Sequence, residues 1–352
     1  MILAEIEEMI QKCVTVEEVD LSGMDFRGAN LHLGRFHGCC LDRTNFSGQV
    51  LDKTGFRDCS FRGADFSECT MTDMFLQKMD FSGALLKGAF LMRCMLHESL
   101  FTGADLSGAK LHWSFLNKCD FSDAGMKSVE IFKCFFSESI LVRSDLTGST
   151  IQRASFDNAD LRGIILKKAH LQKVVLSNAD LSGHDFSSQK LREINFMGAN
   201  LKGARLAHAD VSHCILQGAK LDGADLTGIH ARNAMFQGAS LREVSARGAD
   251  FSQSYFGEAD LTLGDFKDAI FKFSPMPKAV CKDAYFVGAD CSNCDMSHAD
   301  LTGANFEGAN LFMATMHGTV EEKTRFTGAN KLLLRGVDKE LAAAENWKPD
   351  EK

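Results

Sequence analysis

The sequence predicts a solenoid in which the chain turns every few residues around one continuous core. Every fifth residue from Leu21 to Met316 forms an unbroken series of 60 positions, and 56 of them are Leu, Phe, Met, Ile or Val. The residue two places earlier is Ala, Cys, Ser, Thr, Gly or Val in 51 of 60 cases, and none of these 120 positions is charged. A period of five matches neither the helix period of about 3.6 nor the strand period of about 2. Each pentapeptide therefore returns one large and one small side chain to a core.

The outward positions indicate how each pentapeptide turns. The residue two places after the large inward residue is often glycine, as at Gly23, Gly63 and Gly103. Glycine adopts positive φ at little cost, which suits a tight corner. Outward aspartates such as Asp105 and Asp160 follow from the same repeat, because Asp favours turns. These carboxylates are therefore interpreted as structural, and pairing two of them as acid and base would be arbitrary.

Several units resemble a known repeat family. Residues 104–108 (ADLSG), 159–163 (ADLRG) and 304–308 (ANFEG) resemble the A(D/N)LXX signature of pentapeptide-repeat proteins, and the resemblance covers about 85% of the chain. It implies an all-β fold, a right-handed quadrilateral β-helix with four pentapeptides per coil. Carried over, the 60 positions make about 15 coils.

A coil of four pentapeptides should give each face its own character every 20 residues. At positions 35, 55, 75 and so on to 315, the outward residue before the large inward one is apolar in eight of 15 cases. The other three faces have only ten apolar residues at 45 such positions. One face is therefore distinct, as the coil predicts.

The two ends of the repeat predict short helical caps. Residues 1–18 carry Leu3, Ile6, Met9, Ile10 and Cys13 at helical spacing, which indicates an N-terminal capping helix. Residues 19–330 are assigned to the β-helix, with no second domain. Residues 331–352 are assigned to a C-terminal cap and tail, with a short helix after its N-cap residue Asp338 and Pro349 beyond its end.

The 12 cysteines fit the core and not a redox or metal site. Ten of them fall on inward positions, where free Cys behaves as a small hydrophobe; only Cys13 and Cys40 do not. Cys291 and Cys294 form a C-x2-C, but both lie on the inward series and no second pair follows. So many unpaired thiols predict a reducing compartment, the cytoplasm. No membrane span or signal peptide is expected.

No catalytic, cofactor or metal site is predicted. The sequence has no G-x-S-x-G, P-loop or H-E-x-x-H motif, and the histidines lie mostly outward. Gln49, His184 and Gln189 are polar residues at small inward positions, and we expect each to find a hydrogen bond in the core or to mark a distorted coil. A regular solenoid also lacks the concave pocket in which chemistry usually occurs.

The favoured function is a non-catalytic bacterial protein-interaction scaffold or adaptor. Contiguous exposed apolar side chains mark interfaces, and the outward face predicted here consists of Phe75, Phe90, Met95, Trp113, Phe115, Phe132, Phe135, Val175, Ile215, Met235 and Tyr255. The expected partner is another protein or a second copy of the chain. Direct nucleic-acid binding is not expected, since the net charge is −8. Membrane binding is not expected either, since no apolar run is long enough to span a bilayer.

Two alternatives come from the family resemblance. Some pentapeptide-repeat proteins mimic DNA and bind DNA gyrase or another topoisomerase, giving quinolone resistance. Here 39 Lys and Arg residues are interspersed among 47 Asp and Glu residues, which disfavours a one-signed surface. The second alternative is an effector or accessory protein of a bacterial secretion system such as type VI.

Overall fold

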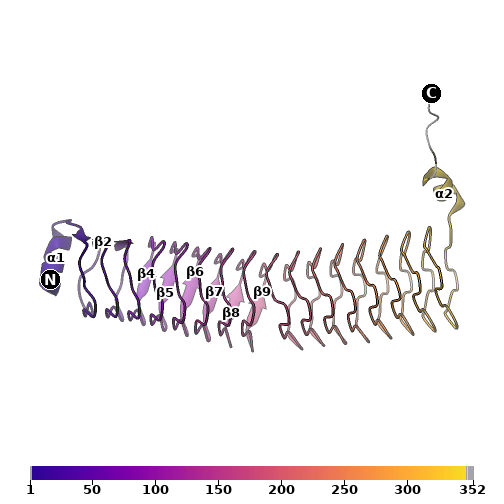
Figure 1. Cartoon of the computed structure of the whole chain (residues 1–352), viewed down its shortest axis with the longest axis horizontal. Helices are drawn as coiled ribbons and strands as arrows, with labels where there is room; N and C mark the ends of the chain where they lie inside the picture. The colour runs from indigo at the N-terminus through magenta and orange to yellow at the C-terminus, as the bar shows by residue number, and fades with distance from the viewer. Residues whose placement is uncertain (1, 346, 348–352) are drawn as a thin grey trace, which may run out of the picture. The chain divides into compact units, whose positions relative to one another are not determined.

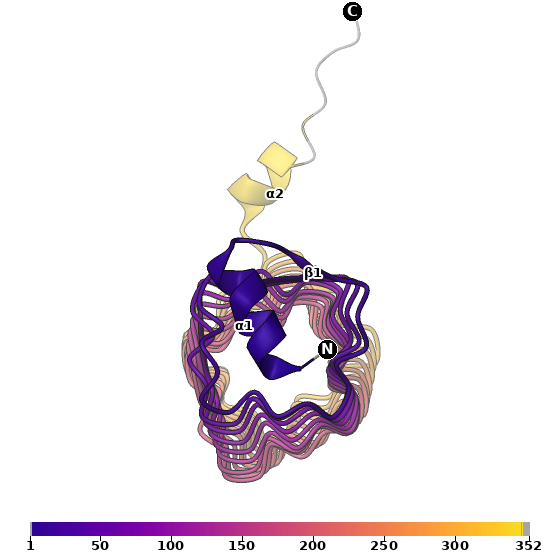
Figure 2. The ribbon, with the colours of Figure 1, turned by 90° about the vertical axis from the view of Figure 1, so that its left-hand side faces the viewer.

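The computed structural model describes residues 2–345 and 347 and is a parallel β-solenoid (Figure 1). Strands pair with residues 20 positions further along, so that β4 (Thr70–Thr72) lies beside β5 (Phe90–Met92) with Met71 opposite Leu91. Four pentapeptides therefore complete one coil. The N-terminal coils have a four-sided outline when viewed end-on (Figure 2). This confirms the predicted fold class.

The regular strands are short because every pentapeptide contains a turn. β1, β2 and β3 form one parallel sheet, and β4 to β9 form another. The pairing of β1 with β2 starts at Val16, inside the segment assigned to the N-terminal cap. The remaining strands are β1 (Val16–Glu17), β2 (Arg35–His37), β3 (Gly55–Arg57), β6 (Lys110–His112), β7 (Glu130–Phe132), β8 (Thr150–Gln152) and β9 (His170–Gln172).

The core consists of the predicted inward side chains. All 60 large positions from Leu21 to Met316 are buried. Phenylalanines stack on their equivalents in the next coil; the ring centroids of Phe101 and Phe121, for example, are 4.7 Å apart. Of the small positions, only five are partly exposed, each in the first or last coil of a compact unit, where one side lacks a neighbouring coil of that unit: Val19, Met24, Ala169, His184 and Gln189.

Many corners are hydrogen-bonded turns. The amide of Ala104 donates to the carbonyl oxygen of Phe101 at 3.0 Å, and Gly103 between them has φ +66°. A positive φ at the third residue is the geometry of a type II turn. The amide of Ser107 donates to the Asp105 carboxylate at 2.9 Å, so the outward aspartate shapes the next corner. The predicted structural role of these residues is confirmed.

The structure separates into two compact units, residues 1–180 and 181–352. Eight successive bridges link residue 20 to residue 180 in the first, and seven link residue 185 to residue 325 in the second. The coil count of each unit therefore differs from the predicted 15, because the coils are divided between two compact units. The pentapeptide series records which side chains point inward, but it does not record how well successive coils pack.

Helix α1 (Leu3–Gln11) lies across the open end of the first coil (Figure 2). Ile6 is fully buried, and the Glu7 carboxylate accepts the amide of Asn30 at 3.0 Å. Cys13, which the helical spacing included, lies beyond the helix with φ +56°. The helix ends earlier because the chain must turn there to enter β1.

Helix α2 (Lys339–Glu345) begins at the predicted N-cap. The Asp338 carboxylate accepts the amides of Glu340 and Leu341 at 3.0 and 3.1 Å. The helix lies beside the coil of its own unit and has no buried residue. Pro349 lies outside the described residues.

The inward cysteines lie where the sequence places them. All ten are buried, whereas Cys13 is exposed and Cys40 is intermediate. Burial raises the pKa of the Cys119 and Cys134 thiols to about 12. All 12 cysteines are free thiols. None of the helices described is long and apolar enough to cross a bilayer.

The three inward polar residues behave differently. The Gln49 side-chain amide donates to the carbonyl oxygens of Phe26 and Ala29, as expected. Gln189 Nε2 donates to the carbonyl oxygen of Asp185 at 3.4 Å. Within the described part of the chain, His184 Nε2 and Gln189 Oε1 are buried without a hydrogen-bond partner, so the expected hydrogen bond is missing for these two atoms.

Candidate functional site

Four outward apolar side chains form a continuous column on the first unit, and all but the half-buried Met95 are exposed. We define the ladder as Phe75, Met95, Phe115 and Phe135, which succeed one another through parallel bridges. Phe75 is 67% exposed, and Phe115 and Phe135 are each 42% exposed. The last two rings stack at 5.1 Å with an interplanar angle of 9°. The repeat thus presents to solvent the same stacking that it uses in its core.

An aromatic cluster lies at the corner next to the ladder. Trp113, at this corner, contacts the edge of Phe132 at 5.9 Å between ring centroids. Phe132 also contacts His112, which in turn meets Phe90 at 5.4 Å. The His112 Nε2 atom lies 3.0 Å from the Glu130 carboxylate. The cluster widens the apolar surface beyond the ladder itself.

The two edges of the ladder differ in charge. On the Trp113 side, Lys133 Nζ lies 3.7 Å from the centre of the indole ring. In the part of the chain that the structure describes, neither Lys133 nor Arg153 pairs with a carboxylate, and we call these two residues the basic edge. Arg93, the preceding basic residue on this side, is neutralised by Asp73 at 2.6 Å.

The opposite edge is neutral. Its corner residues alternate in sign and form ion pairs between adjacent coils. The Nζ atom of Lys78 lies 3.5 Å from a Glu98 oxygen, and that of Lys118 lies 3.7 Å from a Glu138 oxygen. Among the described residues, a partner therefore meets unpaired positive charge only on the Trp113 side, beside the last ladder coil and the coil after it.

A hollow adjoins the N-terminal end of the ladder. Gly55 precedes Phe75 by one coil and has no side chain to cover that ring. The hollow has a volume of about 360 Å³, and its lining includes Arg35, Arg57 and the Phe75 ring.

The structure brings together only part of the predicted face. Ser155 separates Val175 from the ladder within the first unit. Ile215, Met235 and Tyr255 follow one another by the same type of bridge, but they belong to the second unit. Phe90, Trp113 and Phe132 adjoin the ladder through the corner cluster.

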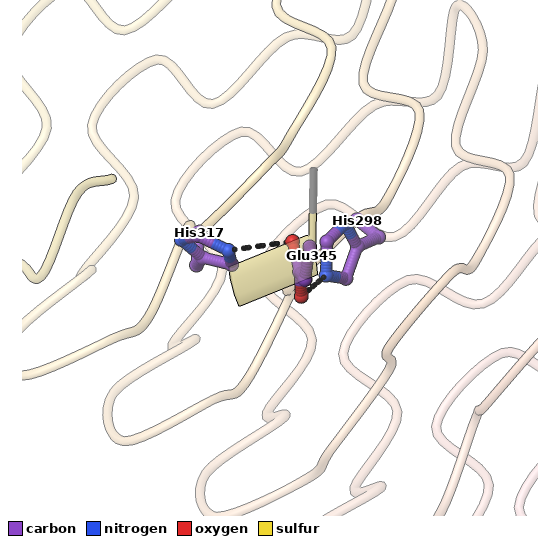
Figure 3. Close-up of side chains that lie close together, drawn as sticks. All are labelled: His298, His317 and Glu345. Carbon is purple, nitrogen blue, oxygen red and sulfur yellow. Dashed lines mark hydrogen bonds and ion pairs between the residues drawn. The ribbon is translucent and has the colours of Figure 1, made fainter. Parts of the chain in front are cut away.

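A second cluster, in the second unit, joins α2 to the solenoid (Figure 3). His298 Nε2 and His317 Nε2 lie 3.1 and 3.2 Å from the two Glu345 carboxylate oxygens. His317 is almost completely buried. Its hydrogen bond to Glu345 is the largest cause of a lowered pKa of that carboxylate.

Two imidazoles and a carboxylate are a ligand set that zinc accepts, and their ligand atoms lie within 4.8 Å of one another. The hydrogen bonding of His317 opposes that use. Its Nδ1 accepts the Asp338 amide at 3.0 Å, so Nε2 carries the proton and donates it to Glu345. A metal at Nε2 needs the opposite tautomer, with Nδ1 donating. The arrangement therefore serves to attach both ends of α2.

The sequence reasoning missed this cluster. His298 and His317 are 19 residues apart, close to one coil, and this spacing was the available signal. The position of Glu345 depends on the path of the chain after the repeat ends, which the pentapeptide period does not encode.

The comparisons with known proteins identify the repeat. The family described as "Pentapeptide repeat region" matches residues 149–226, and "Pentapeptide repeats (8 copies)" matches residues 13–48, 59–97, 76–112, 93–123, 216–245, 234–272 and 278–318. No curated protein matches the chain.

Two solved structures illustrate the similarity. Full-length QnrB1, a plasmid-mediated fluoroquinolone resistance protein, is 19% identical over 59% of this chain and 93% of its own, with a TM-score of 0.32. HetL from the cyanobacterium Nostoc sp. strain PCC 7120, a pentapeptide repeat protein involved in heterocyst differentiation regulation, is 23% identical over 64% of this chain and 86% of its own, with a TM-score of 0.20. Because the ranges matched by the family cover most of the sequence, the chain belongs to the pentapeptide repeat family.

Proposed function

We propose that this chain is a non-catalytic protein-interaction scaffold that binds its partner through the ladder. The observation that carries the proposal is the column of four adjacent outward apolar side chains, with Phe75, Phe115 and Phe135 exposed and Met95 half-buried, flanked by the Trp113 cluster. Contiguous apolar surface of this kind marks interfaces, and aromatic side chains dominate their binding energy. The buried free thiols support a cytoplasmic location.

The use of the outward carboxylates supports a non-catalytic role. Asp145, Asp225 and Asp300 each accept the amide of the residue two places later, at 2.9 to 3.0 Å. Burial raises the pKa of Asp145 and Asp300, but hydrogen bonds from the side chains and amides of Thr147 and Thr302, with a nearby lysine, outweigh it and leave the pKa below its usual value. Carboxylates with lowered pKa that shape turns are poor general acids at neutral pH.

The pairing of charges favours the ladder over DNA mimicry. Acidic side chains repeatedly face basic ones in adjacent coils, as in Arg93–Asp73 at 2.6 Å, Arg143–Asp123 at 2.6 Å and Arg242–Asp260 at 2.8 Å. Local neutralisation removes the dense negative charge that a DNA mimic needs. We therefore place binding in the apolar surface.

The test replaces three ladder residues at once. In the variant Phe75→Ser, Phe115→Ser, Phe135→Ser, folding should be nearly unchanged, because exposed substitutions usually alter stability by about 0.5 kcal/mol or less. The matched control replaces three similarly exposed residues on other faces of the same unit, Leu85, Leu100 and Ile140, with serine. Purification from cells that naturally express the chain identifies partners, and light scattering reports self-association.

The ladder variant should lose a partner or an oligomer that both the parent and the control retain. Circular dichroism verifies that both variants are folded. The proposal fails if the folded ladder variant keeps the oligomeric state and every partner of the parent.

A further inference from the structure

We infer that the partner element is an acidic amphipathic α-helix, which lies along the ladder with its acidic side over the basic edge. This inference rests on the proposed function and specifies its partner. It depends on three features of the first unit: the spacing of the ladder, the charge difference between its edges and the stacking of its rings.

The spacing of the ladder matches a helix better than a strand. Adjacent coils are about 4.8 Å apart, so four ladder residues span about 14 Å. Helix residues at i, i+3, i+7 and i+10 rise by about 4.5, 10.5 and 15 Å from the first, within about 1 Å of the ladder positions. Alternate residues of a strand are about 6.6 Å apart, so three such steps exceed the length of the ladder by about 5 Å.

The charges fix the chemistry of the partner. Lys133 covers one face of Trp113, and Arg153 lies one coil further along the same corner. A carboxylate that meets Lys133 gains an ion pair in a partly apolar setting, where charges attract more strongly than in water. The ion pairs of Lys78 with Glu98 and of Lys118 with Glu138 leave no comparable attraction on the opposite edge. The acidic side of the helix therefore lies over Lys133 and Arg153.

The packing of the rings disfavours single-stranded nucleic acid, which also seeks aromatic and basic surfaces. Bases bind by stacking on open ring faces. Phe115 and Phe135 already stack on each other at 5.1 Å, and Lys133 occupies a face of Trp113. These ring faces are therefore already covered, whereas aliphatic side chains of a helix can pack against the exposed remainder of the column.

The hollow beside Phe75 supplies an anchor point at one end. Gly55 leaves room for one large side chain against the Phe75 ring, where the lining also includes Arg35 and Arg57. Interfaces commonly seat a single apolar anchor in such a place. A helix whose three turns contact the ladder can therefore place one more apolar side chain in the hollow beside Phe75.

The experiment uses the intrinsic fluorescence of the full chain. The protein has two tryptophans, and Trp347→Phe leaves Trp113 as the single reporter. The probe is a synthetic helical peptide with leucines at i, i+3, i+7 and i+10 and glutamates along one flank. Matched probes carry lysine for glutamate, a central proline that breaks the helix, or alternating leucine and glutamate that favours a strand. A thymidine oligonucleotide serves as the nucleic-acid probe.

The acidic helix should give a saturable change in Trp113 emission, and Lys133→Glu with Arg153→Glu should weaken its binding at least ten-fold. The matched control reverses the same number of charges on the opposite edge, Lys78→Glu with Lys118→Glu, and should change the affinity less than three-fold. Added salt should reduce the difference between the two variants, because it screens exposed charges. Thermal melts verify that every variant is folded.

The inference is overturned if the acidic helix gives no saturable change in Trp113 emission at peptide concentrations up to about 1 mM. Only binding with a Kd weaker than that concentration would escape detection. It is equally overturned if both charge reversals weaken binding alike, or if the basic, proline, strand or oligonucleotide probe binds as tightly. The proposed function has a separate outcome. If the strand probe binds the parent but not the variant with serines in the ladder, the scaffold function is supported and the helical partner is excluded. If the serine variant keeps every partner of the parent, the scaffold function itself is excluded.

Discussion

The corners of the coil combine backbone geometry with function. Trp113, Lys133 and Arg153 occupy corners with φ of +52° to +55°, a region that costs a side chain with a Cβ about 1–2 kcal/mol. Their amides donate to the carbonyl oxygens of the next coil, which fixes this geometry. Glycine would fit these corners with less strain. The aromatic cluster and the basic edge are therefore built at positions where the repeat itself favours glycine.

A pair of glycine substitutions tests the corner geometry. Gly103 has φ +66° and open space around it, so Gly103→Ala should destabilise the first unit by about 1 kcal/mol through backbone strain alone. Gly125 lies on a flat face without positive φ, and Gly125→Ala should stay within about 0.5 kcal/mol. Chemical denaturation measures both. Equal losses would contradict a backbone origin.

The polar inward residues act at the level of one coil. His184 lies in the first coil of the second unit, at a position that most pentapeptides fill with a small residue. Its ring contacts Phe186 at 4.2 Å between centroids, and its Nε2 has no hydrogen-bond partner among the described residues. Burial lowers the pKa of His184 to about 4. This coil must therefore keep an imidazole neutral.

This lowered pKa predicts an acid-sensitive coil. Between pH 6.5, the ordinary value, and pH 4 the unfolded chain binds a proton that the folded chain resists, so stability falls as the pH falls through this window. His184→Ala should remove that dependence. Between pH 7.5 and pH 5, the variant should therefore lose roughly 1–2 kcal/mol less unfolding free energy than the parent. The control is the exposed His213→Ala. Thermal melts at both pH values would refute the idea if the two variants kept the same pH dependence.

Over the whole molecule, the ladder belongs to the first unit and the His298–His317–Glu345 attachment to the second. In a solenoid each coil contacts only its neighbours, so damage spreads along a unit by nearest-neighbour coupling. A change in the middle of the first unit should therefore affect that unit most. The ladder side chains lie on the middle coils of the first unit, so their arrangement depends on those coils being folded.

One inward charge tests this coupling. Leu116 is fully buried between ladder coils, and Leu116→Asp places an unpaired carboxylate there, which should destabilise the first unit by about 4 kcal/mol or more. Leu100→Asp makes the same substitution at an exposed position and should change stability by about 0.5 kcal/mol. Hydrogen exchange should show that amides in residues 96–136 lose protection while those of the second unit remain protected. If the melting temperature of Leu116→Asp were within a degree or two of that of the parent, residue 116 could not point into the core.

The amino-acid sequence alone determined the repeat, the inward residues, the corners and the ten buried thiols. These features are local, because each pentapeptide repeats the same choice of large, small and turn residues. It also placed Phe75, Met95, Phe115 and Phe135 on one face, since a 20-residue coil fixes which residues are stacked.

The tertiary structure alone decided the rest. The contact of Lys133 with Trp113, the ion pairs that neutralise the opposite edge and the attachment of α2 by His317 depend on side-chain geometry between coils or on a segment outside the repeat. The division into two compact units is also seen only in the folded chain, because the uniform five-residue period continues through residue 180 without a break. The repeat fixes where side chains point, and contacts between coils fix what those side chains do.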